Sequence, residues 1–546
     1  MEKNWEVLQK KADEGVIDLL LKHRGVKTLK QRREFFNPTH PLKISTSQVG
    51  ISEKEIKKAV KGIKKAISKK QKIIVYGDYD ADGITASAIL WEALYEFEAD
   101  VVPYIPDRFE EGYGIGSIQI TNLKSQYKNL GLIITVDTGI VAFEAADKAR
   151  ELGVDLIITD HHEPEDRNPE ALAVIHSTQI SGSAVSWFLA REFVSNSKAE
   201  DLLSLAALGT VADQLPLRKE NRSIVKYGLE SLRKTQRPGI LALCAVAAVD
   251  PTEIDVYGIN FVLAPRLNAM GRLEHAIDSL RLLCTKNQSQ AYSQAELLEK
   301  TNLKRREIVE QALTHAYAIA KEQKLHSIIV VGHEQYHEGV IGLIASKLSE
   351  TYSLPAIVFS KGEKISKASG RSISGFNLIQ NVRKLDKYLI SGGGHEMAAG
   401  FSVETKDVEQ FSFEMQKLAA SQITSTMKQK KITIDLELAF SDLSFEIAQD
   451  LERFEPTGIG NFKPIFVTRN VTLISFKKVG DEGKHLKLEF KHDGREYGAI
   501  AFGLGPSSDN LIENQKLDIA YNFEINRWKG YENLQLKIRD LRPSSV

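Results

Sequence analysis

The sequence predicts an α/β protein in which two α/β domains are joined by a long helix and followed by a C-terminal β-barrel. Between residues 72 and 176, apolar runs of four to six residues alternate with helical segments, a pattern typical of a parallel sheet covered on both faces. Residues 289–323 contain neither proline nor glycine and are long enough for one connecting helix. From about residue 430, five or six short strands with little helix between them indicate a small barrel.

Length and composition are those of a multidomain globular protein. At roughly 100–200 residues per domain, 546 residues correspond to three or four domains. Hydrophobic residues make up 42% and charged residues 26%, which excludes a disordered or fibrous protein. Lysine plus arginine and aspartate plus glutamate both number 72, so nucleic acid would have to be bound through local patches and not through net charge.

Cysteine usage and hydropathy predict a cytoplasmic protein that does not enter a membrane. The two cysteines, Cys244 and Cys284, are too few for a disulfide framework or a cysteine-rich zinc site. The charged N-terminus, MEKNWEVLQK, lacks the apolar core of a signal peptide, and no apolar run approaches 18 residues.

The elements follow one another in a regular order. Residues 51–70 form an amphipathic helix whose lysine face either contacts nucleic acid or is simply solvated. Strand candidates are KIIVY, DVVPY, GLIITV, DLIIT and ALAVIH in the first α/β region, and SIIVVG, PAIVF and KASGRS in the second. We expect an N-terminal helical segment (1–50), a first α/β domain (51–235), a helical region with the connecting helix (236–324), a second α/β domain (325–424) and the barrel (425–546).

The strongest local signal is the segment YGDYDADG, which follows the first strand. Asp78, Asp80 and Asp82 stand at alternate positions of a loop bounded by glycines. Because three neighbouring carboxylates repel one another, a bound cation is the simplest reason to keep them together. A solvated acidic turn and a calcium loop are the alternatives, although the helix–loop–helix context of a calcium loop is missing.

Further polar residues follow other elements of the same predicted sheet. Asp137 comes after LIITV, Asp160, His161 and His162 come after LIIT, and a helix ends at Asp213. The carboxyl ends of parallel strands meet at one edge, where sites form. Mixed carboxylate and imidazole ligands suit manganese, magnesium or iron. The number of carboxylates suggests two metal ions about 3.5–4 Å apart, which would activate water at a phosphoryl centre.

These motifs resemble those of a known superfamily. GDYDADG (77–83), VDTG (136–139), DHH (160–162) and GTVAD (209–213) are similar to the four motifs of the DHH phosphoesterases, in the same order. Almost the whole chain resembles one branch, the RecJ single-stranded-DNA exonucleases. The further similar segments are IPDRFEEGYG (105–114), APRLNAMGR (264–272), HEGVIGLIASKL (337–348), ASGRS (368–372), GGGHEMAAG (392–400) and FEPTGIGNFKPIF (454–466). The chain departs from the family pattern at Thr138, His176 and Tyr336, none of which is an expected ligand.

The resemblance implies roles for the residues at the sheet edge. Two divalent ions, manganese in preference to magnesium, would be bound, with Asp137 as the bridging ligand. Asp160 would orient the ligating imidazole, and His162 would face the scissile phosphate, so these two are the expected catalytic residues. The implied metal ligands are Asp78, Asp80, Asp82, Asp137, His161 and Asp213.

The resemblance also implies where the substrate binds. Arg108, Ser369 and Arg371 would form a pocket for a terminal 5′-phosphate, joined by Arg272, because a guanidinium fork suits a phosphate. The three glycines of GGGHEMAAG would let backbone N–H groups approach an anion to which His395 donates, unless they only form a tight turn.

The C-terminal β region resembles an oligonucleotide-binding (OB) barrel. Its aromatic side chains would stack on bases without reading their identity, although we expect half of them to lie in the barrel core. The aromatic candidates are Phe466, Phe476, Tyr521, Phe523, Trp528 and Tyr531, and the basic candidates are Lys477, Lys478, Lys487 and Arg527.

The family resemblance thus implies a metal-dependent exonuclease that degrades single-stranded DNA processively from the 5′ end to mononucleotides, in DNA repair and recombination. Its implied partners are single-stranded DNA, a RecQ-type helicase and a single-strand-binding protein. The alternatives are a DHH-family phosphodiesterase of short oligonucleotides or cyclic dinucleotides, a manganese pyrophosphatase, and a non-catalytic DNA-binding scaffold. The first two have no need of a barrel, and scaffold members lose motif carboxylates that this chain retains.

Overall fold

The computed structural model describes residues 3–11, 15–322, 327–528 and 530–544. The chain falls into two compact units, each assembled from segments that are distant in sequence. The first unit comprises residues 50–212 and 231–430. The second comprises residues 2–49, 213–230 and 431–546.

The first unit contains the expected parallel sheet. Its strand order is β3-β2-β4-β5-β6, and every neighbouring pair is parallel. All residues of β4 are buried, which explains its continuous apolar sequence, since helices cover both faces of the sheet. The strands are β2 (Lys72–Tyr76), β3 (Val101–Tyr104), β4 (Leu130–Val136), β5 (Asp155–Asp160) and β6 (Ala173–His176).

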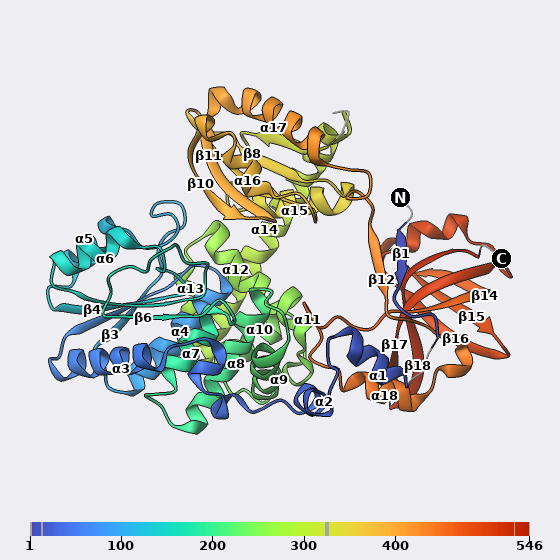
Figure 1. The fold of residues 1–546 in the computed structure, drawn as a ribbon, viewed down its shortest axis with the longest axis horizontal. Coiled ribbons are helices and arrows are strands. Elements are labelled where there is room, and N and C mark those ends of the chain that lie inside the picture. The colour runs from blue at the N-terminus through green and yellow to red at the C-terminus, as the bar shows by residue number, and fades with distance from the viewer. Residues whose placement is uncertain (1–2, 12–14, 323–326, 529, 545–546) are drawn as a thin grey trace. The chain divides into compact units, whose positions relative to one another are not determined.

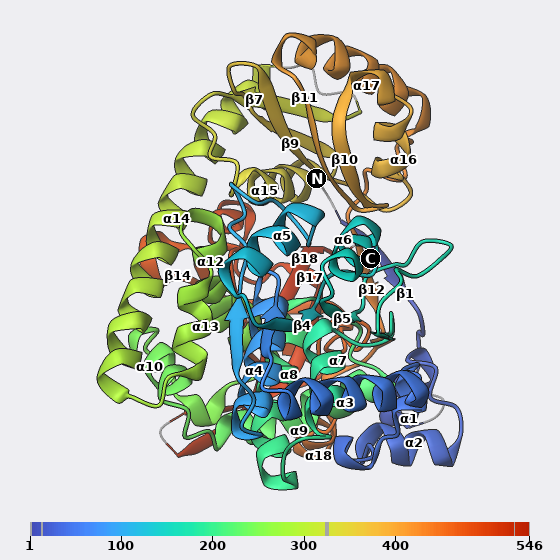
Figure 2. The same ribbon diagram turned by 90° about the vertical axis from the view of Figure 1, so that its left-hand side faces the viewer.

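Helices α5 and α6 lie on one face of this sheet, and α3, α4 and α7 lie on the other (Figure 1, Figure 2). Helix α3 is the predicted amphipathic helix, with Ile56 and Ile63 buried and its lysines outward. The helices of this domain are α3 (Glu53–Ser68), α4 (Ala81–Glu96), α5 (Ser117–Gln126), α6 (Phe143–Glu151), α7 (Gly182–Ala190) and α8 (Asn196–Ala212).

The predicted connecting helix is α14 (Gln288–Glu322), a single helix of 35 residues. It follows α10 (Pro238–Val246), a π-helical turn at Ile259–Leu263, α12 (Ala264–Leu273) and α13 (Ile277–Cys284). The region between the two sheets is therefore helical, as its sequence predicts.

The second sheet of this unit has the order β10-β11-β9-β8-β7, in which only β7 and β8 are parallel. The glycine cluster forms strand β10, which is exposed and pairs with β11 in a hairpin, so it is more than a tight turn. A Cβ at Gly392 would lie 2.8 Å from that of Phe401 on the paired strand, which explains the glycine there. The elements are β7 (Ile329–His333), α15 (Ile341–Tyr352), β8 (Ala356–Ser360), β9 (Ile365–Arg371), α16 (Leu378–Arg383), β10 (Leu389–His395), β11 (Ala398–Glu404) and α17 (Val408–Gln422).

The second unit contains the predicted barrel. Strands run in the order β14-β15-β16-β18-β17, and a further pairing of β14 with β17 closes the sheet on itself. These strands are β14 (Phe466–Val479), β15 (His485–His492), β16 (Arg495–Ala501), β17 (Lys516–Trp528) and β18 (Tyr531–Pro543).

The N-terminal segment shares the core of the barrel. Strand β1 (Asn4–Val7), which was not predicted from the sequence, pairs with β12 (Lys431–Ile434). Helices α1 (Val16–His23) and α2 (Leu29–Phe36) pack their apolar side chains against those of the barrel. The buried guanidinium of Arg222, in α9 (Lys219–Arg233), donates to the backbone carbonyls of Phe454 and Pro456.

The barrel aromatics divide between core and surface, as expected. Phe466, Tyr521 and Phe523 are buried, Phe476 is partly buried, and Tyr531 is 79% exposed. The side chain of Trp528 lies outside the described part of the structure. None of the described helices combines the length and apolar character that a membrane span requires.

Candidate active site

The loop between β2 and α4 holds its carboxylates in fixed positions. Asp80 caps α4, and its Oδ1 accepts hydrogen bonds from the backbone N–H groups of Asp82 (2.9 Å) and Gly83 (3.0 Å). Asp78 Oδ1 accepts from Tyr79 N at 2.7 Å. A Cβ at Gly83 would lie 2.6 Å from that of Asp78, so only glycine fits where the loop passes this close.

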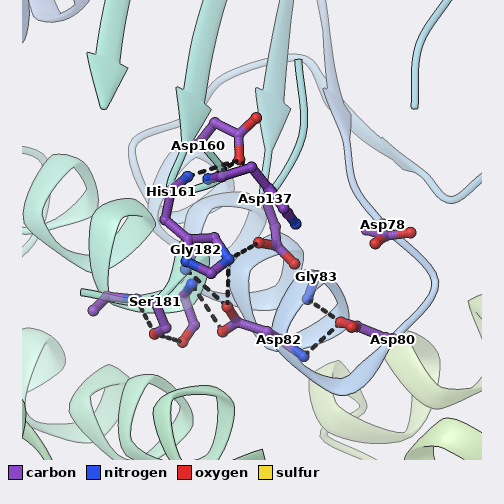
Figure 3. Close-up of polar contacts among 12 residues, drawn as sticks. Asp78, Asp80, Asp82, Gly83, Asp137, Asp160, His161, Ser181 and Gly182 are labelled. Carbon is purple, nitrogen blue, oxygen red and sulfur yellow. Dashed lines mark hydrogen bonds and ion pairs between the residues drawn. The ribbon is translucent and has the colours of Figure 1, made fainter. Parts of the chain in front are cut away.

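Asp82 is buried and is held by a second element. Its two oxygens accept from the backbone N–H groups of Gly182 (2.8 Å) and Ser183 (3.0 Å), at the start of α7. Figure 3 shows these contacts, with the carboxylates of Asp80, Asp82 and Asp137 and the ring of His161 grouped below the ends of the strands. A helix N-terminus therefore supports one of the expected ligands.

Asp137 stands directly after β4 with a φ of 60°, in the left-handed region that non-glycine residues rarely adopt. This conformation directs its carboxylate toward the loop of Asp80 and Asp82 (Figure 3). Asp137 Oδ1 is buried and lies 3.1 Å from His161 Nε2, but the two atoms are not aligned for a hydrogen bond. Two ligand atoms that face each other in this way suit a shared cation.

Asp160 and His162 form a closely bonded pair. The Asp160 carboxylate lies 2.7 Å from His162 Nδ1 and also accepts from the backbone N–H groups of Ile140, His161 and His162. Burial opposes ionisation of Asp160, but these hydrogen bonds prevail and its pKa is lowered. We expected Asp160 to orient the imidazole of His161; the ring contact in the structure is with His162.

Within the described part of the first unit, two groups of side chains could each hold a metal ion. Asp78, Asp80 and Asp137 form one and Asp137, His161 and His162 the other, with ligand atoms within 4.8 Å of one another in each. Asp137 belongs to both groups.

The electrostatics of the cluster fit a divalent cation. Burial, reinforced by the charge of Asp80, raises the pKa of Asp78 to about 8. Burial likewise raises the pKa of Asp82, and it raises that of Asp137 well above the ordinary value. Burial lowers the pKa of His161, which favours the neutral imidazole that ligates metals. Burial therefore disfavours the charged forms of Asp78, Asp82 and Asp137, and a divalent ion would neutralise them.

Asp213 is the residue that follows α8. The last turn of this helix reaches the site through Gly209, where a Cβ would lie 2.3 Å from Asp82 Oδ1. Asp213 stands four residues beyond Gly209, which is about one helical turn. Its role as a ligand remains a prediction from the family motif.

Arg272 experiences the charges of Arg108 and Arg371, the other two arginines expected to bind phosphate. Burial, together with the charges of Arg108, Arg305 and Arg371, lowers the pKa of Arg272 to about 10. Arg108 stacks on the ring of Tyr79 at 5.0 Å. Such a concentration of cations favours an anionic ligand.

The arginines and Ser369 come from both α/β domains. Arg272, in α12, donates to Gly339 O at 3.0 Å, just before α15. Ser369 and Arg371 are neighbours on β9, where Arg371 Nη1 donates to Gly370 O at 2.9 Å. His395 lies on the exposed strand β10, and no contact found among the described residues joins it to the arginines.

Several residues around the site were missed from the sequence. Asn268 Oδ1 accepts from Ala81 N at 2.7 Å and so positions the start of α4. A Cβ at Gly271 would lie 2.6 Å from Tyr79 O. Tyr113 Oη lies 3.1 Å from His162 Nε2. All three residues stand inside segments that resemble family motifs, and this resemblance could have drawn attention to them. The spacing of residues in the sequence does not reveal which atoms they contact.

Known proteins resemble this chain along almost its whole length. Three family models match: "DHH family, N-terminal domain" at residues 72–210, "DHHA1 domain" at 322–421 and "RecJ OB domain" at 434–540. The chain is 32% identical over 526 residues to the single-stranded-DNA-specific exonuclease RecJ of Escherichia coli (strain K12), covering 89% of this chain and 90% of that protein. The protein belongs to the RecJ family.

A second RecJ relative, from Bacillus subtilis (strain 168), is 34% identical over 537 residues, covering 96% of this chain and 67% of that protein. Among solved structures, RecJ from Thermus thermophilus in complex with Mn²⁺ matches with a TM-score of 0.82 and 26% identity, covering 100% of this chain and 80% of that chain. The same protein in complex with Mg²⁺ matches with a TM-score of 0.75 and 25% identity, covering 100% and 79%. The predicted family and fold class are thereby confirmed, and a divalent metal agrees with the acidic cluster.

Proposed function

We propose that this RecJ-family protein is a metal-dependent exonuclease that hydrolyses single-stranded DNA processively from the 5′ end to mononucleotides, in DNA repair and recombination. The observation that carries the proposal is the cluster of buried carboxylates with His161 at the carboxyl edge of the parallel sheet. Membership of the RecJ family supports single-stranded DNA as the substrate, because the relatives are named as single-stranded-DNA-specific exonucleases.

Two divalent ions would occupy the cluster, manganese in preference to magnesium. Asp137 would bridge them, and the other ligands would be Asp78, Asp80, Asp82, His161 and Asp213. When bound, such ions activate water and stabilise the charge that develops on a phosphodiester. Carboxylate oxygens with one imidazole favour manganese or magnesium over metals that prefer thiolates.

The protein's own residues would position the strand. Asp160 holds His162 through Nδ1, which leaves Nε2 to face the scissile phosphate. Arg108, Arg272 and Arg371, with Ser369, would bind the terminal 5′-phosphate. A pocket for a terminal phosphate beside the hydrolytic centre would favour cleavage from the 5′ end, and base identity would not be read.

The rival functions lack this support. A phosphodiesterase of short oligonucleotides or cyclic dinucleotides would need no OB barrel, yet the family match extends over residues 434–540. A non-catalytic scaffold would not need to keep so many carboxylates buried together.

We further propose that the protein acts in the cytoplasm, together with a RecQ-type helicase and a single-strand-binding protein. The helicase would supply the single strand, and the binding protein would cover it.

The test uses DNA labelled at either end, single-stranded or duplex, with Mn²⁺, Mg²⁺ or a chelator. We expect metal-dependent release of mononucleotides from the 5′ end of the single strand, absent in Asp80→Asn. Binding of the DNA without cleavage, with Mn²⁺ and with Mg²⁺ alike, would overturn the proposal in favour of a non-catalytic scaffold. Cleavage confined to the shortest oligonucleotides would overturn it in favour of the small-substrate phosphodiesterase.

A further inference from the structure

Tyr113 contacts a ring nitrogen of His162, the residue expected to face the scissile phosphate. Tyr113 Oη lies 3.1 Å from His162 Nε2, and the two rings are 6.0 Å apart at 74°. The other ring nitrogen of His162 is engaged by Asp160 at 2.7 Å. Nε2 is the atom expected to face a substrate oxygen, and the Tyr113 hydroxyl is within hydrogen-bond distance of it.

Tyr113 lies between two anchored points of the loop that joins β3 to α5. On one side, the Glu111 carboxylate accepts from Tyr104 Oη (2.8 and 2.9 Å) and from Asp107 N (3.0 Å). On the other side, Gly114 O accepts from the buried Tyr76 hydroxyl at 3.0 Å. Between these anchors stand only Gly112 and Tyr113.

The short segment between the anchors can change its backbone conformation. Gly112 and Gly114 have φ values of 81° and 84°, a region open to glycine but strained for other residues. A Cβ at Gly112 would have no neighbour within 4 Å, so nothing packs against this point. The Tyr113 side chain is 57% exposed, and besides His162 its ring faces that of Tyr79, 6.3 Å away. Few packing contacts therefore oppose a swing of Tyr113 away from His162.

We propose that Tyr113 is a gate on His162: in the strand-free protein its hydroxyl occupies Nε2, and the terminal nucleotide must displace it to reach the catalytic centre. The inference rests on the proposed function, because it takes His162 to face the scissile phosphate. A protein whose competent state is only partly populated binds with an affinity reduced by that fraction. If one hydrogen bond holds Tyr113 on His162, the apparent affinity of the protein for the DNA strand would be reduced about fivefold.

The kinetic test is Tyr113→Phe, which keeps the ring and removes the hydroxyl. On a 5′-phosphorylated single strand we expect KM to fall about fivefold while kcat stays within about twofold. Tyr95→Phe is the matched control, since Tyr95 is also exposed and packs on Trp91, away from His162. A fall in kcat with KM unchanged would overturn the proposal, because it would make Tyr113 a positioning residue. Unchanged constants would overturn it as well.

A second measurement does not depend on cleavage. Diethyl pyrocarbonate modifies accessible neutral imidazole nitrogens, and the His162 side chain is 36% exposed. In metal-free protein, peptide mapping should show that His162 is modified several times faster in Tyr113→Phe than in wild type or Tyr95→Phe. Equal rates would show that the hydroxyl does not cover Nε2 and would overturn the gate. If the protein failed to cleave DNA but this difference appeared, the proposed function would fail and the contact at Nε2 would stand.

Discussion

Asp82 accepts a hydrogen bond of 2.8 Å from the backbone N–H of Gly182, a residue 100 positions further along the chain. Asp82 belongs to α4 and Gly182 begins α7, so an expected metal ligand in one element is held by the first turn of another. The free N–H groups at a helix N-terminus favour a carboxylate at this place. The geometry of the site therefore depends on how α7 packs and not only on the acidic loop.

Gly182→Ala should damage the site without touching a ligand. Its Cβ would lie 2.3 Å from Asp137 Oδ1 and 2.6 Å from Asp137 Cβ, so the start of α7 or Asp137 has to move. We expect hydrolysis to fall at least 100-fold and the free energy of unfolding to fall by about 1–3 kcal/mol. Steady-state kinetics measures the loss of hydrolysis, and urea unfolding measures the change in the free energy of unfolding. Gly498→Ala, which meets no atom within 4 Å, is the control; wild-type activity in Gly182→Ala would contradict the packing described.

Asp80 is both an expected metal ligand and the N-cap of α4, and two substitutions distinguish these roles. Asp80→Ala removes a ligand and the N-cap of α4, and loss of a cap destabilises a protein by about 1 kcal/mol. Asp80→Asn keeps a capping oxygen but not the charge. Both variants, and His161→Ala, should lose hydrolysis, while thermal melting should distinguish the two Asp80 variants. Turnover at the wild-type rate in any of them would contradict the metal assignment.

Asp160→Asn tests the support of His162. The Asp160 carboxylate holds His162 Nδ1 at 2.7 Å and accepts from three backbone N–H groups. Loss of such a supporting partner reduces activity about 10–100-fold. We expect kcat to fall by this factor with KM nearly unchanged, as steady-state kinetics on a 5′-phosphorylated strand would show. A change confined to KM would mean that the pair serves binding alone.

The stability of the metal-free protein should fall as pH rises. Burial raises the pKa of Asp78 to about 8 and also raises those of Asp82 and Asp137, whereas an unfolded aspartate titrates near 4. Between these values the folded state binds more protons than the unfolded chain, so the free energy of unfolding decreases with rising pH. In EDTA, Tm should fall from about pH 5.5 to about pH 8.5.

Adding Mn²⁺ should raise Tm most at the high end of this range, because the ion replaces the protons of the carboxylates. Asp78→Asn should reduce the dependence on pH in EDTA. Differential scanning calorimetry measures Tm against pH for the protein in EDTA, for the protein with Mn²⁺ and for Asp78→Asn in EDTA. A Tm of the metal-free protein that rose with pH would contradict the raised pKa values of these buried carboxyl groups.

The barrel carries a like-charge pair that suits a phosphate backbone. Lys477 on β14 and Lys487 on β15 are exposed and directly opposite each other in register, an arrangement that destabilises a sheet slightly. If both contact phosphates, replacing both by glutamine should weaken binding of single-stranded DNA. The slope of log K against log salt should then fall by about 1.4, with Tm unchanged or slightly higher. Fluorescence anisotropy at several salt concentrations measures the slope; an unchanged slope would place the strand elsewhere.

Much of the fold could be predicted from patterns that are local in sequence. The strands β2, β4 and β5 are apolar runs, α14 lacks helix breakers, and the alternation of both classes predicts a parallel sheet. The acidic loop and the DHH motif directly follow such strands, so the edge on which they meet was also predictable. The main exception is β1, which is short and pairs with a strand more than 400 residues away.

By itself, then, the sequence determined the fold class and the family, because both follow from patterns in contiguous residues. Only the tertiary structure decided that Asp160 holds His162, that Gly182 supports Asp82, and that Tyr113 lies on Nε2 of His162. The physical reason is that hydrogen bonds and close approaches depend on distances of a few ångströms between elements. Those distances are set by packing, which no local pattern encodes.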